Sequence, residues 1–259
     1  MNANLRIASL VPSVTELLVA LGLGPRLVAR TGFCVHPAAA LAAVPKVGGT
    51  KDVNLDKLRR LAPTHIVVNV DENRLETVQA LRGWGVELVV THPCSPEDVP
   101  GLIADLAARL ARGEDAALVR SRAAALENEL QAELTATTPA GRPARSVLYL
   151  IWRDPWMTVA RDTYISRLLA RVNWHTLPAL EGGERGAARY PVLEGRPAWL
   201  DEVREVLLSS EPYAFGPQHL AEAAALCPGA RVRLVDGEAL GWYGARTAPG
   251  LRYLRGLVG

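Results

Sequence analysis

Tryptophan and arginine recur in two short segments of the second half of the chain, a combination that can hold a flat ligand. Trp152, Arg153 and Trp156 form the segment WRDPW, directly after an apolar run. Trp242 and Arg246 form the second group, within GWYGAR. Indole faces stack on planar groups, and a guanidinium pairs with carboxylate or amide edges. We expect ligand binding here; the alternative is that the rings only cover the core, the usual fate of tryptophan.

Cysteine and histidine occur together in two segments of the first half. Cys34 and His36 lie in GFCVHP, and His92 and Cys94 lie in THPCSP. Each segment follows an expected strand, so these side chains are expected at one edge of a sheet, where ligands of open α/β sheets bind. They can form a Cys2His2 zinc site; the alternative is loop residues without metal, because the spacing fits no established finger pattern. Cys227 is expected to be a buried apolar residue.

Strands that alternate with helices must position these side chains, and this order predicts parallel βα units. The expected strands are 6–12, 27–31, 65–70, 86–90, 147–151 and 231–235. A first helix is expected over 14–21, with Ser13 as its N-cap and Glu16 completing a capping box. We also place Ser13 among the expected ligand-binding residues.

A repeat divides the chain into two halves. The segments IVVNVDE and VLLSSE end at Glu72 and Glu211, which lie 139 residues apart (211 − 72), and a helix and a strand follow each of them. Between the halves lies a helical stretch of about 21 residues, or roughly 30 Å at the α-helical rise. We therefore predict an α/β fold with two Rossmann-like lobes: an N-terminal lobe over 1–112, a linking helix over 113–138 and a C-terminal lobe over 139–259.

Composition excludes several classes of protein. The chain has 259 residues, of which 49% are hydrophobic and 22% charged, so it is not a disordered chain. Three cysteines do not make a disulfide scaffold. The net charge of +2 indicates no nucleic-acid partner, and the absence of a long apolar span predicts no membrane insertion. No leader pattern opens the sequence, which predicts a cytoplasmic protein; a periplasmic or other extracytoplasmic site is the alternative if a leader is missing.

The segments SLVPSVTE, VPKVGGTKDVNLDKLRRLAP and GWYGARTAPGLRYL together resemble the helical-backbone metal receptor superfamily. This superfamily comprises the substrate-binding proteins of ABC importers for vitamin B12, haem and ferric siderophores, and the chain is most similar to its cobalamin-binding members. The resemblance covers nearly the whole chain. It implies a class III periplasmic-binding-protein fold, a metal chelate bound between the lobes, no prosthetic group and no enzymatic activity.

The resemblance also implies roles for individual residues. Trp242 and Arg246 fall on cobalamin-contacting positions, and His36 falls near a pocket-wall tyrosine, where an imidazole can coordinate iron or cobalt from the axial side. In the family each lobe presents an acidic residue to arginines of the permease, and the repeat pair Glu72 and Glu211 fits this role. The alternative is that both glutamates are exposed acids at helix starts, favoured by the helix dipole.

Two functions follow from these expectations. The first is a binding protein for a corrinoid or related metal chelate such as haem, serving as the substrate-binding component of an ABC importer with an ABC permease as its partner. The alternative is a cytosolic protein on the same fold, an enzyme or metallochaperone that handles a corrinoid or a metal. The missing leader favours the alternative, and the lack of a nucleophile, base and metal triad favours the binding protein.

Overall fold

A computed structural model describes residues 5–259; residues 1–4, with which the expected N-terminal lobe begins, lie outside the described residues. The chain divides into two compact units. The first unit runs to Pro93 and adds Asp98–Gln131 and Tyr243–Ala245. The second unit comprises Cys94–Glu97, Ala132–Trp242 and Arg246–Gly259.

The first unit is built on a parallel sheet whose strands are short and buried. In the described chain this sheet has four strands in the order β2-β1-β3-β4. The strands are β1 (Ile7–Ser9), β2 (Leu27–Arg30), β3 (His65–Asn69) and β4 (Glu87–Thr91). Every residue of β3 is buried, as expected for a β-branched run that is covered on both faces.

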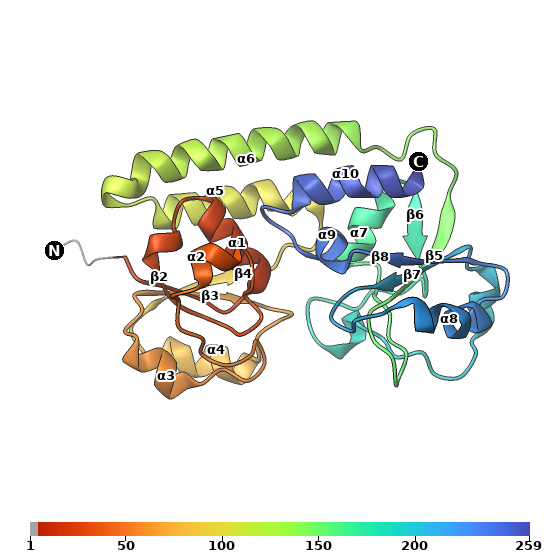
Figure 1. Cartoon of the computed structure of the whole chain (residues 1–259), viewed down its shortest axis with the longest axis horizontal. Helices are drawn as coiled ribbons and strands as arrows, with labels where there is room; N and C mark the ends of the chain where they lie inside the picture. The colour runs from red at the N-terminus through yellow and green to blue at the C-terminus, as the bar shows by residue number, and fades with distance from the viewer. Residues whose placement is uncertain (1–4) are drawn as a thin grey trace. The chain divides into compact units, whose positions relative to one another are not determined.

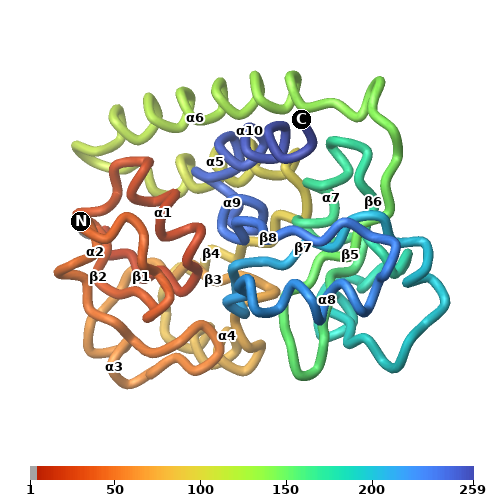
Figure 2. The backbone as a smooth tube through the Cα atoms, turned by 45° about the vertical axis from the view of Figure 1, so that its right-hand side comes forward, coloured from red at the N-terminus to blue at the C-terminus, as the bar shows by residue number. Residues whose placement is uncertain are grey.

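Helices cover both faces of this sheet. They are α1 (Pro12–Ala20), α2 (Ala38–Leu41), α3 (Leu55–Arg60), α4 (Leu75–Arg82) and α5 (Val99–Leu110). α3 and α4 lie on one side of the sheet, and α1 and α5 lie on the other (Figures 1 and 2). Leu58 of α3 and Leu81 of α4 join Ile66 and Val68 of β3 in one apolar core. These layers leave the carboxyl ends of the strands free to carry functional loops.

The second unit repeats this plan. Its described sheet has four parallel strands in the order β6-β5-β7-β8. The strands are β5 (Arg145–Leu150), β6 (Trp174–Thr176), β7 (Glu205–Ser209) and β8 (Arg231–Val235). Its helices are α7 (Tyr164–Ala170), α8 (Leu220–Leu226), α9 (Gly237–Gly241) and α10 (Thr247–Val258). α8 covers one face, and α7, α9 and α10 lie on the other (Figures 1 and 2).

The predicted fold class is confirmed. Both sheets have the same strand order, and β3 and β7 hold the same place in it, as a duplicated lobe requires. The long helix α6 (Ala116–Ala136) has 21 residues; it begins in the first unit and ends in the second. Short 3-10 helices add turns at Gly24–Arg26, Pro96–Asp98, Gly113–Asp115, Ala187–Arg189, Ala198–Glu202 and Pro217–His219.

The expected start of the first helix is wrong. α1 begins at Pro12, and its N-cap is Val11, which makes no side-chain cap. Proline is favoured at the first helical position because its ring fixes φ and because its missing N–H would have no partner there. The Thr15 N–H donates to the Val11 carbonyl at 2.8 Å, so the helix already includes Ser13.

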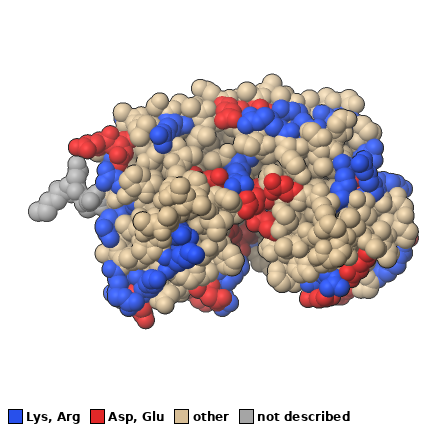
Figure 3. Space-filling model, in the orientation of Figure 1, with Lys and Arg blue, Asp and Glu red and all other residues tan. Residues whose placement is uncertain are grey.

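Charges are mixed on the surface. On the face in Figure 3 basic and acidic side chains alternate, and a basic group gathers over α3, whose last turn carries Lys57, Arg59 and Arg60. Among the described helices, none is both long enough and apolar enough to cross a membrane.

Candidate functional site

Two asparagines organise the carboxyl end of β3 in the first unit. The Asn69 side-chain oxygen accepts hydrogen bonds from the backbone N–H groups of Asp71 (2.7 Å) and Glu72 (3.1 Å). The Asn73 side-chain oxygen accepts from the Asn69 N–H at 2.8 Å. Both asparagines are buried, so the turn that carries Asp71 and Glu72 is fixed from inside. This pair was not predicted from the sequence, although the letters NVDEN directly after a buried strand are a recognisable turn signal.

Tyr243 completes this end of the first unit. Its hydroxyl accepts a hydrogen bond from Asn69 Nδ2 at 2.8 Å. Burial raises the pKa of the Tyr243 hydroxyl well above its ordinary value, so the phenol stays protonated. Ser13 is also buried and lies near this hydroxyl. An expected ligand-binding residue is therefore next to a tyrosine that comes from the far end of the sequence.

Gly244 allows the chain to bring Tyr243 to this position. Its φ is +90°, a conformation that glycine adopts without cost, and a Cβ there would lie 3.2 Å from Leu17 Cβ. The segment Tyr243–Ala245 therefore packs directly on α1.

The expected zinc set is not assembled. In the part of the chain that the structure describes, there is no group of three or more His, Cys, Asp or Glu residues that could hold a metal ion. Cys34 is buried, and its sulfur accepts a hydrogen bond from Thr15 Oγ1 at 3.0 Å. Burial raises the pKa of the Cys34 thiol, which disfavours the thiolate that a metal requires. His92 pairs with Asp71 at 3.5 Å, and Cys94 belongs to the second unit.

His36 lies in an ordered loop after β2. The Arg30 guanidinium donates to the Cys34 carbonyl at 3.0 Å and holds this loop. Phe33 is 62% exposed, and His36 is partly exposed. The loop therefore presents an aromatic ring and an imidazole at the surface of the first unit, and axial coordination by His36 stays a prediction.

Aromatic side chains gather at the carboxyl ends of β5 and β7 in the second unit. Trp156 stacks on Phe215 with ring centroids 5.8 Å apart and planes 4° apart. Trp152 meets Tyr213 edge-on at 5.7 Å, and His219 lies 5.4 Å from Tyr213. We call these five residues the aromatic cluster. Trp152 is 41% exposed, so one large indole is presented on a support of packed rings.

Only part of the aromatic cluster was predicted from the sequence. Trp152 and Trp156 were expected in the site, and the structure brings them together. Tyr213, Phe215 and His219 were missed, although their segment EPYAFGPQH directly follows β7. The strand-end rule applied to WRDPW points equally to this segment.

Arg153 is held by carboxylates beside the aromatic cluster. Its guanidinium pairs with Glu222 at 2.8 Å and with Asp154 at 2.7 Å. A guanidinium has five N–H donors, so these two contacts leave capacity for another acceptor.

Trp242 and Arg246 form contacts within their own unit that were not expected. Trp242 is only 8% exposed, and its Nε1–H donates to Glu211 Oε1 at 2.5 Å. The Arg246 guanidinium lies over the Trp242 ring, 5.0 Å from its centroid, and pairs with Glu238 at 2.7 Å. The Trp242 ring is therefore largely covered by charged side chains of its own unit, and its expected role in ligand binding stays a prediction.

The two glutamates of the repeat differ in their surroundings. Neither Glu72 nor Glu211 is fully exposed. Burial raises the pKa of the Glu211 carboxyl to about 7, against the opposing effect of the hydrogen bond from Trp242. Both acids were expected to be exposed, and the structure shows both as partly buried. Their role in docking to a permease stays a prediction.

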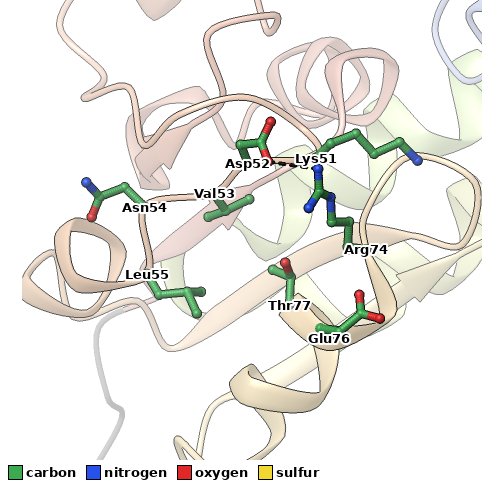
Figure 4. A pocket seen from close by; sticks show the side chains of 8 residues that line it. All are labelled: Lys51, Asp52, Val53, Asn54, Leu55, Arg74, Glu76 and Thr77. Carbon is green, nitrogen blue, oxygen red and sulfur yellow. Dashed lines mark ion pairs between the residues drawn. The ribbon is translucent and has the colours of Figure 1, made fainter.

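The first unit also contains a hollow of about 490 Å³ that contains none of the expected site residues. It is lined by Lys51, Asp52, Val53, Asn54, Leu55, Arg74, Glu76 and Thr77 (Figure 4). Arg74 and Asp52 form an ion pair at 3.0 Å across it, and both side chains are more than half exposed. Mixed, solvated charges of this kind contribute little to ligand binding.

The fold and the strand-end surfaces define a class. Two α/β units of the same strand order, joined through one long helix, are the architecture of class III periplasmic binding proteins. A family model described as periplasmic binding protein matches residues 7–83. The fold is also that of the periplasmic vitamin B12-binding protein of Vibrio cholerae, with a TM-score of 0.78, 19% identity and coverage of 98% of this chain and 96% of that one. The periplasmic haem-binding protein of the same organism gives a TM-score of 0.76, 22% identity and 99% coverage of both chains.

Similar sequences agree with this class. A vitamin B12-binding protein of Photorhabdus laumondii is 28% identical over 210 residues, which cover 81% of this chain and 69% of that protein. A vitamin B12-binding protein of Vibrio vulnificus is 31% identical over 94 residues, covering 36% of this chain and 34% of that protein. These matches are consistent with the superfamily that the sequence resembles, and the relatives named here are vitamin B12-binding proteins. The names of the similar proteins describe binding of vitamin B12 or haem.

Proposed function

We propose that this chain binds a corrinoid of the vitamin B12 type, or a related metal chelate such as haem, and delivers it to the permease of an ABC importer. The observation that carries this proposal is the aromatic cluster, with Trp152 41% exposed at the carboxyl edge of a parallel sheet. Corrin and porphyrin rings are broad, flat and largely apolar, and stacking on an indole contributes about 1 kcal/mol beyond buried area. The names of the similar proteins support the same ligand class.

Binding of this kind requires no reaction at the protein. The chelate carries its own metal, and the chain supplies shape, stacking and a small number of polar contacts. Arg153 and the hydroxyl of Tyr213 are the polar groups next to the exposed indole. In the first unit, Ser13 and His36 are the proposed contacts, with His36 as an axial ligand of the chelated metal.

We also propose the partner and the compartment. Glu72 lies three residues after β3 and Glu211 two residues after β7, and they are our proposed contacts with arginines of the permease. The solved structures of similar fold are those of periplasmic proteins, which supports the extracytoplasmic alternative for this chain.

A binding screen tests the proposal. The protein is incubated separately with cyanocobalamin, ferric haem and a ferric siderophore, desalted, and examined by visible absorption. We expect a corrinoid or haem spectrum to remain with the protein at near-equal stoichiometry. Trp152→Ala is expected to lose most of the retained ligand, and Leu118→Ala, a truncation of an exposed apolar residue of α6, serves as the matched control. Elution of the protein without any of the three compounds would refute the proposal.

A further inference from the structure

Tyr213 lies inside the aromatic cluster but keeps a polar end near its exposed indole. Its backbone N–H donates to the Ile151 carbonyl at 3.2 Å, which ties the segment after β7 to the end of β5. Its ring meets Trp152 edge-on at 5.7 Å. The residue is partly exposed. Its hydroxyl is thus fixed by the backbone in the neighbourhood of the surface on which we propose the ligand stacks.

His219 fixes one hydrogen bond of that hydroxyl. The Gly216 backbone N–H donates to His219 Nδ1 at 2.9 Å. A ring nitrogen that accepts a hydrogen bond carries no proton, so the imidazole proton lies on Nε2. Nε2 is 3.3 Å from the Tyr213 hydroxyl. His219 therefore donates to the tyrosine oxygen and does not accept from it.

Packing prevents the imidazole from turning over. His219 is 8% exposed, and its ring lies 5.4 Å from both Tyr213 and Phe215, edge-on to each. A flipped ring would place a carbon atom against the Gly216 N–H and leave that donor without its partner, which is unfavourable for a partly buried group. The direction of the hydrogen bond to Tyr213 is therefore set by the fold.

Arg153 is the second neighbour of the same oxygen. Its guanidinium lies close to the Tyr213 hydroxyl. Arginine can only donate, and so can the Nε2–H of His219. A phenol oxygen accepts two hydrogen bonds and keeps one proton of its own. Both neighbours can only donate, so neither of them takes the proton of Tyr213.

We propose that Tyr213 donates this proton to an acceptor oxygen on the edge of the bound planar chelate. The acceptor is an amide carbonyl at the rim of a corrinoid or a carboxylate at the rim of a haem. His219 is the positioning residue that turns the phenol proton outward. This inference rests on the proposed function and adds a specific contact to it: Tyr213 selects planar ligands whose rim carries an acceptor oxygen over planar ligands without one.

Selection follows from the cost of leaving a polar group unmatched. A ring that covers Tyr213 without offering an acceptor removes the hydroxyl from water and gives it no new partner. A ring with an amide or carboxylate at that position restores the bond. Discrimination of this kind exceeds what stacking alone supplies, because every flat ring offers a similar face.

The test compares the wild-type protein with Tyr213→Phe, which keeps the ring and removes only the hydroxyl. Affinities are measured by quenching of tryptophan fluorescence with cyanocobalamin, ferric haem and ferric octaethylporphyrin, whose rim carries no oxygen. We expect Tyr213→Phe to weaken binding about three- to tenfold for the ligand or ligands that present an acceptor. Binding of ferric octaethylporphyrin is expected to become tighter in the variant, because no hydroxyl is then left without a partner under the ring. A loss of affinity for cyanocobalamin would identify an amide carbonyl as the acceptor, and a loss of affinity for haem would identify a carboxylate.

A second comparison isolates the role of His219. His219→Phe keeps an aromatic ring and removes the Nε2–H donor. It is expected to weaken binding in the wild-type background and to add nothing in the Tyr213→Phe background, because it acts only through the hydroxyl. A purely structural role would give the same loss in both backgrounds. Independently of any ligand, ¹⁵N NMR of the histidine ring is expected to show Nδ1 without a proton.

The outcomes separate this inference from the function on which it rests. If Trp152→Ala weakens binding and Tyr213→Phe leaves every affinity unchanged, the proposed function stands and the role of Tyr213 is overturned. That role is overturned as well if Nδ1 of His219 carries the proton. If the wild-type protein binds none of the three compounds, the proposed function fails and this inference fails with it.

Discussion

The carboxylate of Glu211 accepts a hydrogen bond from the indole Nε1–H of Trp242 at 2.5 Å. Glu211 lies two residues after β7, and Trp242 directly follows α9. The hydrogen bond therefore links the loop after β7 to the end of α9. Burial raises the pKa of Glu211, as do Glu238 and Asp236, whereas the hydrogen bond from Trp242 and the charge of Arg246 lower it. A carboxyl with a pKa of about 7 changes charge near neutral pH, and its partner is a buried indole.

Glu211 should therefore make stability depend on pH. The folded-state pKa of about 7 is raised above the ordinary value of 4.5. As the pH rises through this range, the unfolded chain releases the proton first, and the folded state loses stability until the pH passes the folded pKa. Glu211→Gln keeps an acceptor for Trp242 and removes this loss. We expect the variant to be more stable than wild type by about 1–3 kcal/mol at pH 8, with the difference vanishing near pH 4.5.

Urea unfolding at a series of pH values measures this effect. Glu202→Gln, at an exposed position of the same unit, is the matched control and should follow the wild-type profile. A Glu211→Gln profile parallel to that of wild type across the whole range would show that Glu211 has an ordinary pKa.

Trp152 should matter for binding and little for folding. Because 41% of its surface is already exposed, Trp152→Ala is expected to change the free energy of unfolding by less than about 1 kcal/mol. Loss of stacking is expected to weaken chelate binding at least about fivefold. Isothermal titration and thermal melting of the same preparation measure both quantities. Equal affinities for wild type and variant would remove Trp152 from the site.

Axial coordination by His36 predicts a spectroscopic change. If its imidazole binds the metal of the chelate, His36→Ala should shift the visible bands of bound ferric haem or corrinoid, because the metal loses a nitrogen ligand. His175→Ala, which alters an exposed histidine of the second unit, should leave the bands in place. Superimposable spectra for wild type and His36→Ala would leave His36 as a loop residue.

A side chain at position 244 should destabilise the protein. Gly244→Ala places a Cβ at a φ of +90° and 3.1 Å from a Leu17 methyl group, so we expect a loss of about 1–3 kcal/mol in unfolding free energy. Gly256→Ala is the control, because a Cβ in that turn of α10 meets nothing within 4 Å. That change is expected to stabilise the protein by about 0.5–1 kcal/mol. Comparable melting temperatures for the two variants would contradict the close approach to α1.

The cysteines should differ in reactivity. Burial raises the pKa of Cys34, and it raises the pKa of Cys227 to about 11, whereas Cys94 is partly exposed. Since the thiolate is the reactive form, iodoacetamide at pH 8 is expected to label Cys94 first. Peptide mapping by mass spectrometry gives the order. Labelling of Cys34 in the folded protein before Cys94 would show that its loop opens readily.

Local patterns predicted most of the fold. The strand expected over 231–235 is β8 itself, and that over 65–70 is β3 with one residue removed. Runs of β-branched residues bounded by breakers specify such strands almost without help from tertiary contacts. The start of α1 was misplaced because Ser13 has the chemistry of an N-cap, while Pro12 can occupy the first helical turn.

Local sequence patterns could predict only part of the candidate site. Trp152 and Trp156 follow a strand, and the position alone marks them. Trp242 lies after β8 and α9, and its burial depends on Glu211 and Arg246, which contact it only in the folded unit. Nothing local to Tyr243 indicates a hydrogen bond with Asn69, which is 174 residues away in sequence. Contacts of such range depend on the whole fold.

The segment Tyr243–Ala245 belongs to the first unit, although the residues on both sides of it belong to the second. A gene fragment that stops at Gln131 would encode the first sheet without the phenol that meets Asn69. A recombination event that replaced the last twenty or so codons would exchange α10 and Tyr243 together, and so alter both units in one step. The end of the gene therefore encodes parts of both units.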